Sequence, residues 1–306
     1  MKEEYLSIYQ KQAIFSAYEC IEDIQAFKEW YNNYSHSGKK IFYRGVKEAK
    51  YKNYTSAQRY CLDNNIDDLP LTIVHKEIEN IRTSNNGLLE KYCNAIGVPC
   101  TDFYIMSIAQ HYSKGYSLYL DFTTNIDTAL FFMCFKSYNE SHNSIDDYCS
   151  IYFSDNIGTP FENVIKHISK STNFSDKNDD VNIFKESSRY AFKKLLSLTP
   201  FEMLFGRNNI IIENRQYPFI FSHKQHSFNT NIIVSNLNIT AQDGCLLFYD
   251  NELKPLESNL CCVDINKSLI PYIRRNYLWP NKKTKKQLFP SNEKIISESI
   301  EIEKYL

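Results

Sequence analysis

The chain has 306 residues, which is enough for one large domain or two smaller ones with a hydrophobic core. Its 35 basic and 36 acidic residues give a net charge of −1, so overall charge provides no attraction to nucleic acids or anionic membranes. The nine cysteines are irregularly spaced without a CxxC pair, which disfavours a zinc ribbon and a secreted disulfide framework. The chain also lacks a signal-like start and a run of about 18 apolar residues, so we expect a cytoplasmic protein without a membrane anchor.

The first predicted elements are a helix and a short strand. Apolar residues recur every three or four positions over residues 13–34, which predicts an amphipathic helix. After a turn, the segment KIFYRGV predicts a strand with Arg44 near its end. An arginine there can present its guanidinium to an anion, and Gly45 would let a ligand approach closely. The alternative is a structural arginine paired with a carboxylate.

Helices dominate the next hundred residues, with one strand among them. Residues 71–96 have helical spacing with a break at Asn85-Asn86-Gly87, and residues 101–112 predict a helix capped by Thr101-Asp102. YSLYLDFTT then predicts a strand, and NIDTALFFMCFKSY predicts a buried helix beginning near Asn125 or Asp127.

The second half of the chain is rich in predicted strands. CSIYFSD, NNIIIEN, QYPFIFS, TNIIVSN, CLLFYD and CCVDIN are short apolar runs bounded by turn-forming residues. The polar stretch at 168–190 predicts an exposed insertion, and a helix is expected around 267–278.

Polar residues gather around the predicted strand YSLYLDFTT. Polar side chains at the end of a strand that leads into an apolar helix either cap that helix or face a pocket. The residues concerned are Gln110, His111, Tyr112, Asp121, Thr123 and Thr124.

These segments resemble the FRG domain family over about residues 40–295. The family is marked by an F-R-G strand, a Ser-x-x-Arg element and a segment of the type QH…RLLDWTxNPxxALxF. The positions that match are Phe42, Arg44, Gly45, Ser56, Arg59, Gln110, His111, Leu120, Asp121, Thr123, Asn125, Ala129, Leu130 and Phe132. The chain departs from the family at Ser113–Leu118, which replaces G-L-P-T-R, and at Phe122, which replaces the tryptophan.

By analogy, this layout resembles ADP-ribosyltransferase-like folds. The resemblance implies an α+β protein with a split β-sheet core and flanking helices, formed by residues 40–306 after a helical segment at 1–39. It implies NAD as substrate and no metal. Arg44 would bind the NAD diphosphate, and Thr123 and Thr124 would flank the nicotinamide ribose. Gly45, Gln110 and Tyr112 are the other residues expected to bind the cofactor. The late strand should follow a catalytic Glu, but Gln242 and Asp243 stand there, so His111 or Asp121 are the other candidates for catalysis.

Three functions remain open at this stage. The first is an ADP-ribosyltransferase or NAD glycohydrolase, for example a microbial toxin or phage-defence effector that modifies a protein or nucleic acid. The second is a non-catalytic module that binds a nucleotide or a protein partner. The third is a role on nucleic acids in which Arg274-Arg275 and the basic run at 282–286 hold phosphates. A regulatory partner protein is compatible with the first two.

Overall fold

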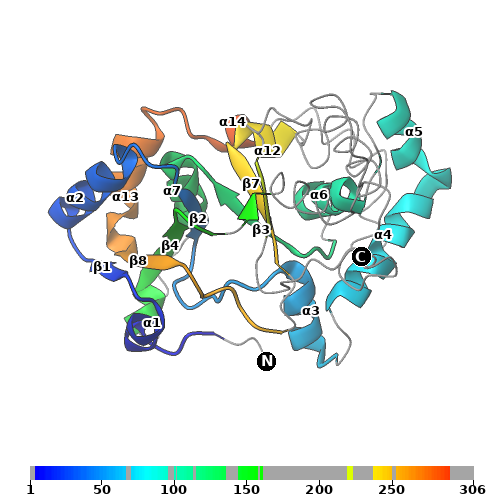
Figure 1. Ribbon diagram of the computed structural model, residues 1–306. Coiled ribbons are helices and arrows are strands. Elements are labelled where there is room, and N and C mark those ends of the chain that lie inside the picture. The colour runs from blue at the N-terminus through cyan, green and yellow to red at the C-terminus, as the bar shows by residue number, and fades with distance from the viewer. Residues whose placement is uncertain are drawn as a thin grey trace, which may run out of the picture.

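The computed structural model describes residues 4–66, 70–95, 100, 102–112, 115–135, 144–157, 159–160, 219–222, 237–249 and 253–289. These residues form a mixed β-sheet flanked by helices (Figure 1). The prediction of an α+β protein is therefore confirmed.

The sheet has eight strands in the described part of the chain, in the order β1-β8-β4-β2-β3-β7-β6-β5. Neighbouring strands are antiparallel except for the pairs β1–β8 and β5–β6. The strands are β1 (Tyr18–Ile21), β2 (Phe42–Val46), β3 (Tyr119–Thr123), β4 (Tyr148–Ser154), β5 (Thr159–Pro160), β6 (Phe219–Ser222), β7 (Gly244–Phe248) and β8 (Cys261–Asn266).

The helices mostly precede or connect these strands. They are α1 (Ile8–Ile14), α2 (Ile24–Ser35), α3 (Ser56–Asn64), α4 (Pro70–Thr83), α5 (Leu88–Ala95), α6 (Asp102–Tyr112), α7 (Ile126–Cys134), α12 (Leu237–Ala241), α13 (Ile270–Ile273) and α14 (Lys285–Leu288). Short helical turns are η1 (Ser84–Asn86), η2 (Ser144–Asp147), η3 (Lys267–Leu269) and the π-helical η4 (Arg274–Leu278).

The sheet is split between β2 and β3. Five residue pairs join β2 to β4, and five join β3 to β7. In contrast, a single pair, Tyr43 with Thr123, joins β2 to β3. The two halves of the sheet therefore separate beside this pair, and side chains rather than backbone ladders bridge the opening.

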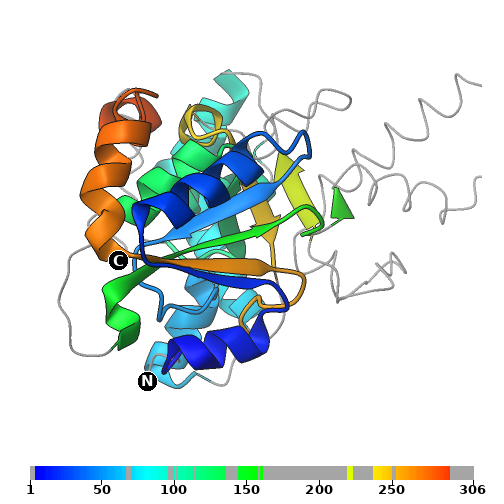
Figure 2. The same cartoon turned by 90° about the vertical axis from the view of Figure 1, so that its left-hand side faces the viewer.

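Each half of the sheet is covered by its own helices. Helices α4, α5 and α6 form one core with β3 and β7, and α2, α7 and α13 form another with β2, β4 and β8 (Figure 1). A third core on the opposite face includes Tyr5 and Phe15, on either side of α1. In Figure 2, α1 and α2 accordingly lie on opposite sides of the strands. Apolar residues alternate between these cores along the strands, as expected for a sheet buried on both faces.

Local sequence explains where several helices begin and end. Asn125 caps α7, because its side-chain oxygen accepts from the backbone N–H groups of Asp127 and Thr128. Gly87 has a φ of 71° and separates η1 from α5, as predicted for the break in the 71–96 segment. The strands predicted at KIFYRGV, YSLYLDFTT, CSIYFSD, QYPFIFS, CLLFYD and CCVDIN are also present.

The predicted helix over residues 13–34 is wrong in its first half. Residues Tyr18–Ile21 form β1, which pairs in parallel with β8. Asp23 starts a new helix at Ile24, because its carboxylate accepts from the N–H groups of Gln25 and Ala26. The N-terminal segment is therefore not purely helical, and it contributes an outer strand to the sheet. The predicted insertion at 168–190 and the strands NNIIIEN and TNIIVSN lie outside the described residues.

Candidate functional site

Arg44 bridges the opening between the two halves of the sheet. Its Nη1 donates to the backbone oxygen of Asp121 at 2.9 Å, and its Nε donates to Asn53 Oδ1 at 3.2 Å. The backbone oxygen of Asp121 therefore accepts from a guanidinium at a position where β2 does not pair with β3. Burial lowers the pKa of Arg44 and the Asp121 carboxylate raises it, but an arginine stays protonated in proteins.

Asp121 is the centre of a polar cluster on β3. Its Oδ2 accepts from Gln110 Nε2 at 2.7 Å, and Gln110 Oε1 in turn accepts from Ser117 Oγ at 2.5 Å. Its Oδ1 lies 3.8 Å from His111 Nε2. The Asp121 side chain is still 42% exposed, although Oδ1 itself is buried, so this carboxylate is held in place and is only partly accessible.

His111 is neutral at physiological pH. Its side chain is only 8% exposed, and burial lowers its pKa, while the Asp121 carboxylate opposes this shift. A neutral imidazole next to an accessible carboxylate can accept a proton, as general base catalysis requires.

A cavity of about 290 Å³ lies at the split in the sheet. Strand β2, the end of α6, β3 and the turn before β7 all contribute to its wall. Of the ten residues predicted for the site, seven line it: Arg44, Gly45, Gln110, His111, Asp121, Thr123 and Gln242. The side chain of Tyr112 lies outside the described part of the structure.

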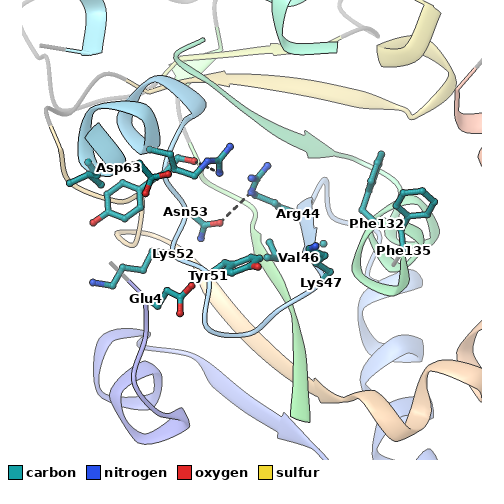
Figure 3. A pocket seen from close by; sticks show the side chains of 14 residues that line it. Glu4, Arg44, Val46, Lys47, Tyr51, Lys52, Asn53, Asp63, Phe132 and Phe135 are labelled. Atoms are coloured by element: carbon teal, nitrogen blue, oxygen red, sulfur yellow. Dashed lines mark hydrogen bonds between the residues drawn. The ribbon is translucent and has the colours of Figure 1, made fainter. Parts of the chain in front are cut away.

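A second cavity of about 440 Å³ adjoins the first, and the two share Arg44, Gly45 and Phe132. Figure 3 shows Arg44 at its centre, bound to Asn53, with Phe132 and Phe135 on one side. Asp63 and Lys52 lie on the other side. Together the two cavities form an extended cleft in which Arg44 occupies the junction.

Arg59 belongs to this cleft although it was predicted only as part of a family motif. It follows the capping box of α3, in which Thr55 and Gln58 bond reciprocally, and it lines the larger cavity. Its Nη1 donates to the backbone oxygen of Tyr54 at 3.0 Å. Burial lowers its pKa, and the carboxylates of Asp121 and Asp63 raise it. The Ser-x-x-Arg element could have identified it.

Several predicted site residues have structural partners instead. Thr123 Oγ1 donates to the backbone oxygen of Gln242 at 2.7 Å, which ties β3 to the turn before β7. Gln242 Nε2 donates to the backbone oxygen of Leu288 at 3.0 Å. The Asp243 carboxylate accepts from Asn125 Nδ2 at 3.1 Å, and the Asp243 backbone oxygen accepts from the N–H of Thr124. Of these, Thr123 and Gln242 line the smaller cavity, whereas Thr124 and Asp243 do not.

Gly45 is required by packing rather than by ligand approach. A Cβ at this position would lie 1.9 Å from the backbone oxygen of Ala129 and 2.8 Å from the backbone nitrogen of Met133. Strand β2 and helix α7 thus touch backbone to backbone. Because neither main chain can yield without moving α7, any side chain here displaces the helix that borders the site.

We therefore expect Gly45→Ala to lower the free energy of unfolding by about 3 kcal/mol or more, because overpacking against backbone is not relieved by rotamer changes. Urea unfolding followed by circular dichroism measures this loss. Gly38→Ala is a matched control, since Gly38 has a φ of 67° but open space around it, and should cost about 1–2 kcal/mol. Equal losses in the two variants would refute the packing argument.

The basic run near the C-terminus is only partly available to a ligand. Arg274 Nη2 donates to the backbone oxygen of Cys134 at 2.5 Å, and Lys283 Nζ donates to Thr128 Oγ1 at 3.1 Å. These two cations therefore hold α7. The other basic side chains of the run, Arg275, Lys282, Lys285 and Lys286, are exposed.

Within the described residues, no group of three or more His, Cys, Asp or Glu is arranged to hold a metal ion. None of the helices in that same part of the chain is long and apolar enough to cross a membrane.

The fold and the site define an α+β protein with a split sheet and an arginine-centred cleft. The family model of the FRG domain matches residues 39–142, so this part of the chain is similar to that domain. The match contains Arg44, Arg59, His111 and Asp121, but it ends before Gln242. Neither the curated proteins nor the solved structures contain a match to the chain.

Proposed function

We propose that this protein is an NAD-consuming enzyme of the ADP-ribosyltransferase-like type. One observation carries the proposal. A single cavity between β2 and β3 is lined by seven of the residues that the sequence predicted for NAD binding and catalysis. These seven residues come from four separate parts of the chain. Such chemistry needs an anion-binding cation and a carboxylate in one site, and Arg44 and Asp121 line the same cavity.

The proposed reaction breaks the bond between nicotinamide and the ribose carbon that bears it. The bonding electron pair leaves with nicotinamide, whose ring becomes neutral, and positive charge develops on the ribose. Asp121 would stabilise that charge, because its carboxylate is accessible and fixed by Gln110. Water or a hydroxyl of an acceptor then bonds to the ribose carbon and passes its proton to neutral His111.

Asp121 fits this role better than the two residues before the late strand. The Asp243 carboxylate holds Asn125, the cap of α7. Gln242 carries no charge, and its amide holds Leu288. Asp121 on β3 would thus take the role that ADP-ribosyltransferase-like folds give to a glutamate before the late strand. We propose that this activity modifies a protein or a nucleic acid, and that the protein acts as a toxin or defence effector.

The test is nicotinamide release from NAD, followed by chromatography with and without cell lysate as a source of acceptor. Arg44→Lys keeps the charge but loses the planar fork that binds Asp121 and Asn53 together, so we expect about 100-fold slower release. Arg82→Lys makes the same chemical change at an ion pair with Asp102 that lines neither cavity, and should leave release unchanged. Release that is absent in both conditions, or equal in Arg44→Lys and wild type, would refute the proposal.

A second candidate function is a non-catalytic nucleotide-binding module. The commitment of Gln242 and Asp243 to structural hydrogen bonds favours it, because neither of these two residues directs a carboxylate into the smaller cavity. This reading predicts that NAD binds to the cleft and is recovered intact.

A further inference from the structure

We propose that the larger cavity is the subsite for the adenosine and phosphate end of the dinucleotide, with Arg59 as its phosphate-binding residue. The identity of the ligand rests on the proposed function. The geometry of the subsite does not, because it follows from the charge, the donors and the aromatic groups of the larger cavity itself.

The charge of the larger cavity favours an anion. Four basic side chains line it, those of Arg44, Lys47, Lys52 and Arg59, against the two acidic ones of Glu4 and Asp63. Glu4 also lies 3.9 Å from Lys50, a cation outside the lining, so its charge is shared. A lining with more basic than acidic side chains favours a ligand that bears phosphate.

The guanidinium groups of Arg44 and Arg59 both interact electrostatically with the Asp121 carboxylate. Arg59 lowers the pKa of Arg44, which shows that the two cations repel each other, and the Asp121 carboxylate raises the pKa of both. The negative charge of Asp121 therefore acts on both arginines, and Arg44 also contacts the Asp121 backbone oxygen. A second anion near Arg44 and Arg59 would relieve their repulsion, and a phosphate group is the ligand that supplies it.

The two arginines also have donors left for such a ligand. Arg44 uses Nε and Nη1 within the protein, and Arg59 uses Nη1. No hydrogen bond joins either Nη2 group to another described residue, and the Arg59 residue is exposed. Planar guanidinium groups with open N–H donors bind phosphate oxygens through paired hydrogen bonds.

The rest of the lining suits a nucleoside. Tyr51 contributes aromatic surface near Asn53 (Figure 3), and the Asp63 carboxylate can accept from a ribose hydroxyl. The volume of about 440 Å³ lies within the range of roughly 300–1,000 Å³ for small-molecule sites. Because Arg44 borders both cavities, one ligand can place its diphosphate at the junction and its nicotinamide end in the smaller cavity.

The experiment is calorimetric titration of the full-length protein with AMP and with ADP-ribose. We expect both to bind, and Arg59→Gln to weaken both about 10- to 100-fold, as for loss of a charged hydrogen bond. Tyr51→Ala should weaken AMP about tenfold through lost stacking, and it tests the subsite if Arg59→Gln does not fold. Arg82→Gln removes a guanidinium outside the cleft and should leave both affinities unchanged.

The outcomes separate the subsite from the reaction. Binding of AMP that depends on Arg59 and Tyr51, without any release of nicotinamide from NAD, would support the subsite and refute the proposed enzyme. NAD consumption by a protein that does not bind AMP would refute the subsite and leave the enzyme standing. AMP affinity that is the same in wild type, Arg59→Gln and Tyr51→Ala would also overturn the inference.

Discussion

Replacing Lys11 by methionine is expected to lower the free energy of unfolding by about 3–5 kcal/mol. Lys11 and Asp264 are both fully buried, with Nζ 2.5 Å from Oδ1. Nζ also donates to Ser150 Oγ at 2.8 Å and to the backbone oxygen of Ala49 at 3.0 Å, so all three of its protons are used. Methionine fills similar space but leaves the Asp264 carboxylate without a cation in the interior.

The effect should extend to the site, because this network joins α1 to β4 and β8. Tyr18 on β1 donates to the second carboxylate oxygen of Asp264 at 2.8 Å, which links the outer strand to the same group. Losing the cation therefore loosens the N-terminal segment against the half of the sheet that carries β2. We expect nicotinamide release to fall in parallel with the folded fraction rather than ahead of it.

Urea unfolding of Lys11→Met measures the loss, with Lys50→Met as matched control. Lys50 also faces a carboxylate, Asp146 at 3.0 Å, but its side chain is 30% exposed, so its removal should cost less than about 1 kcal/mol. Adding Asp264→Asn to Lys11→Met should recover part of the stability, because the buried charge disappears. A Lys11→Met loss as small as that of Lys50→Met would contradict the assignment.

Local sequence patterns predicted most of the elements around the cleft. The strand with Arg44, the strand with Asp121 and the helix capped by Asn125 each carry short-range signals, namely β-propensity and a capping side chain. By contrast, β1 was missed because Ile21, Ile24, Phe27 and Trp30 follow a helical period across the true helix start at Asp23. Pairing with a strand at the far end of the chain decided the conformation there, and such long-range contacts leave no local pattern.

The sequence indicated which residues lie at the cleft better than it indicated what each of them does there. The family resemblance implied that Arg44, His111 and Asp121 would share a site, and all three line one cavity in the structure. Sequence could not show that Gly45 packs against the backbone of α7. Nor could it show that Thr123 serves the turn before β7, because both facts depend on which backbone groups approach in three dimensions.

Replacing Asp121 by asparagine is expected to slow nicotinamide release about 1,000-fold, the scale of losing a group that stabilises transition-state charge. Asparagine has the same shape and keeps a side-chain oxygen for Gln110 Nε2, while the backbone oxygen that holds Arg44 is unchanged. The variant therefore removes one negative charge beside the ribose and little else. Its urea unfolding curve should stay close to that of the wild type.

Asp121→Asn should not weaken nucleotide binding, although it should slow nicotinamide release. The charge of Asp121 favours the protonated forms of Arg44 and Arg59, so its neutralisation should leave both guanidinium groups more attractive to phosphate. ADP-ribose should consequently bind to Asp121→Asn as tightly as to the wild type or more tightly, although turnover is lost. Calorimetry and nicotinamide release on one preparation compare the two effects. Wild-type turnover in Asp121→Asn would exclude this carboxylate from catalysis, and weaker ADP-ribose binding would show that it serves ligand binding instead.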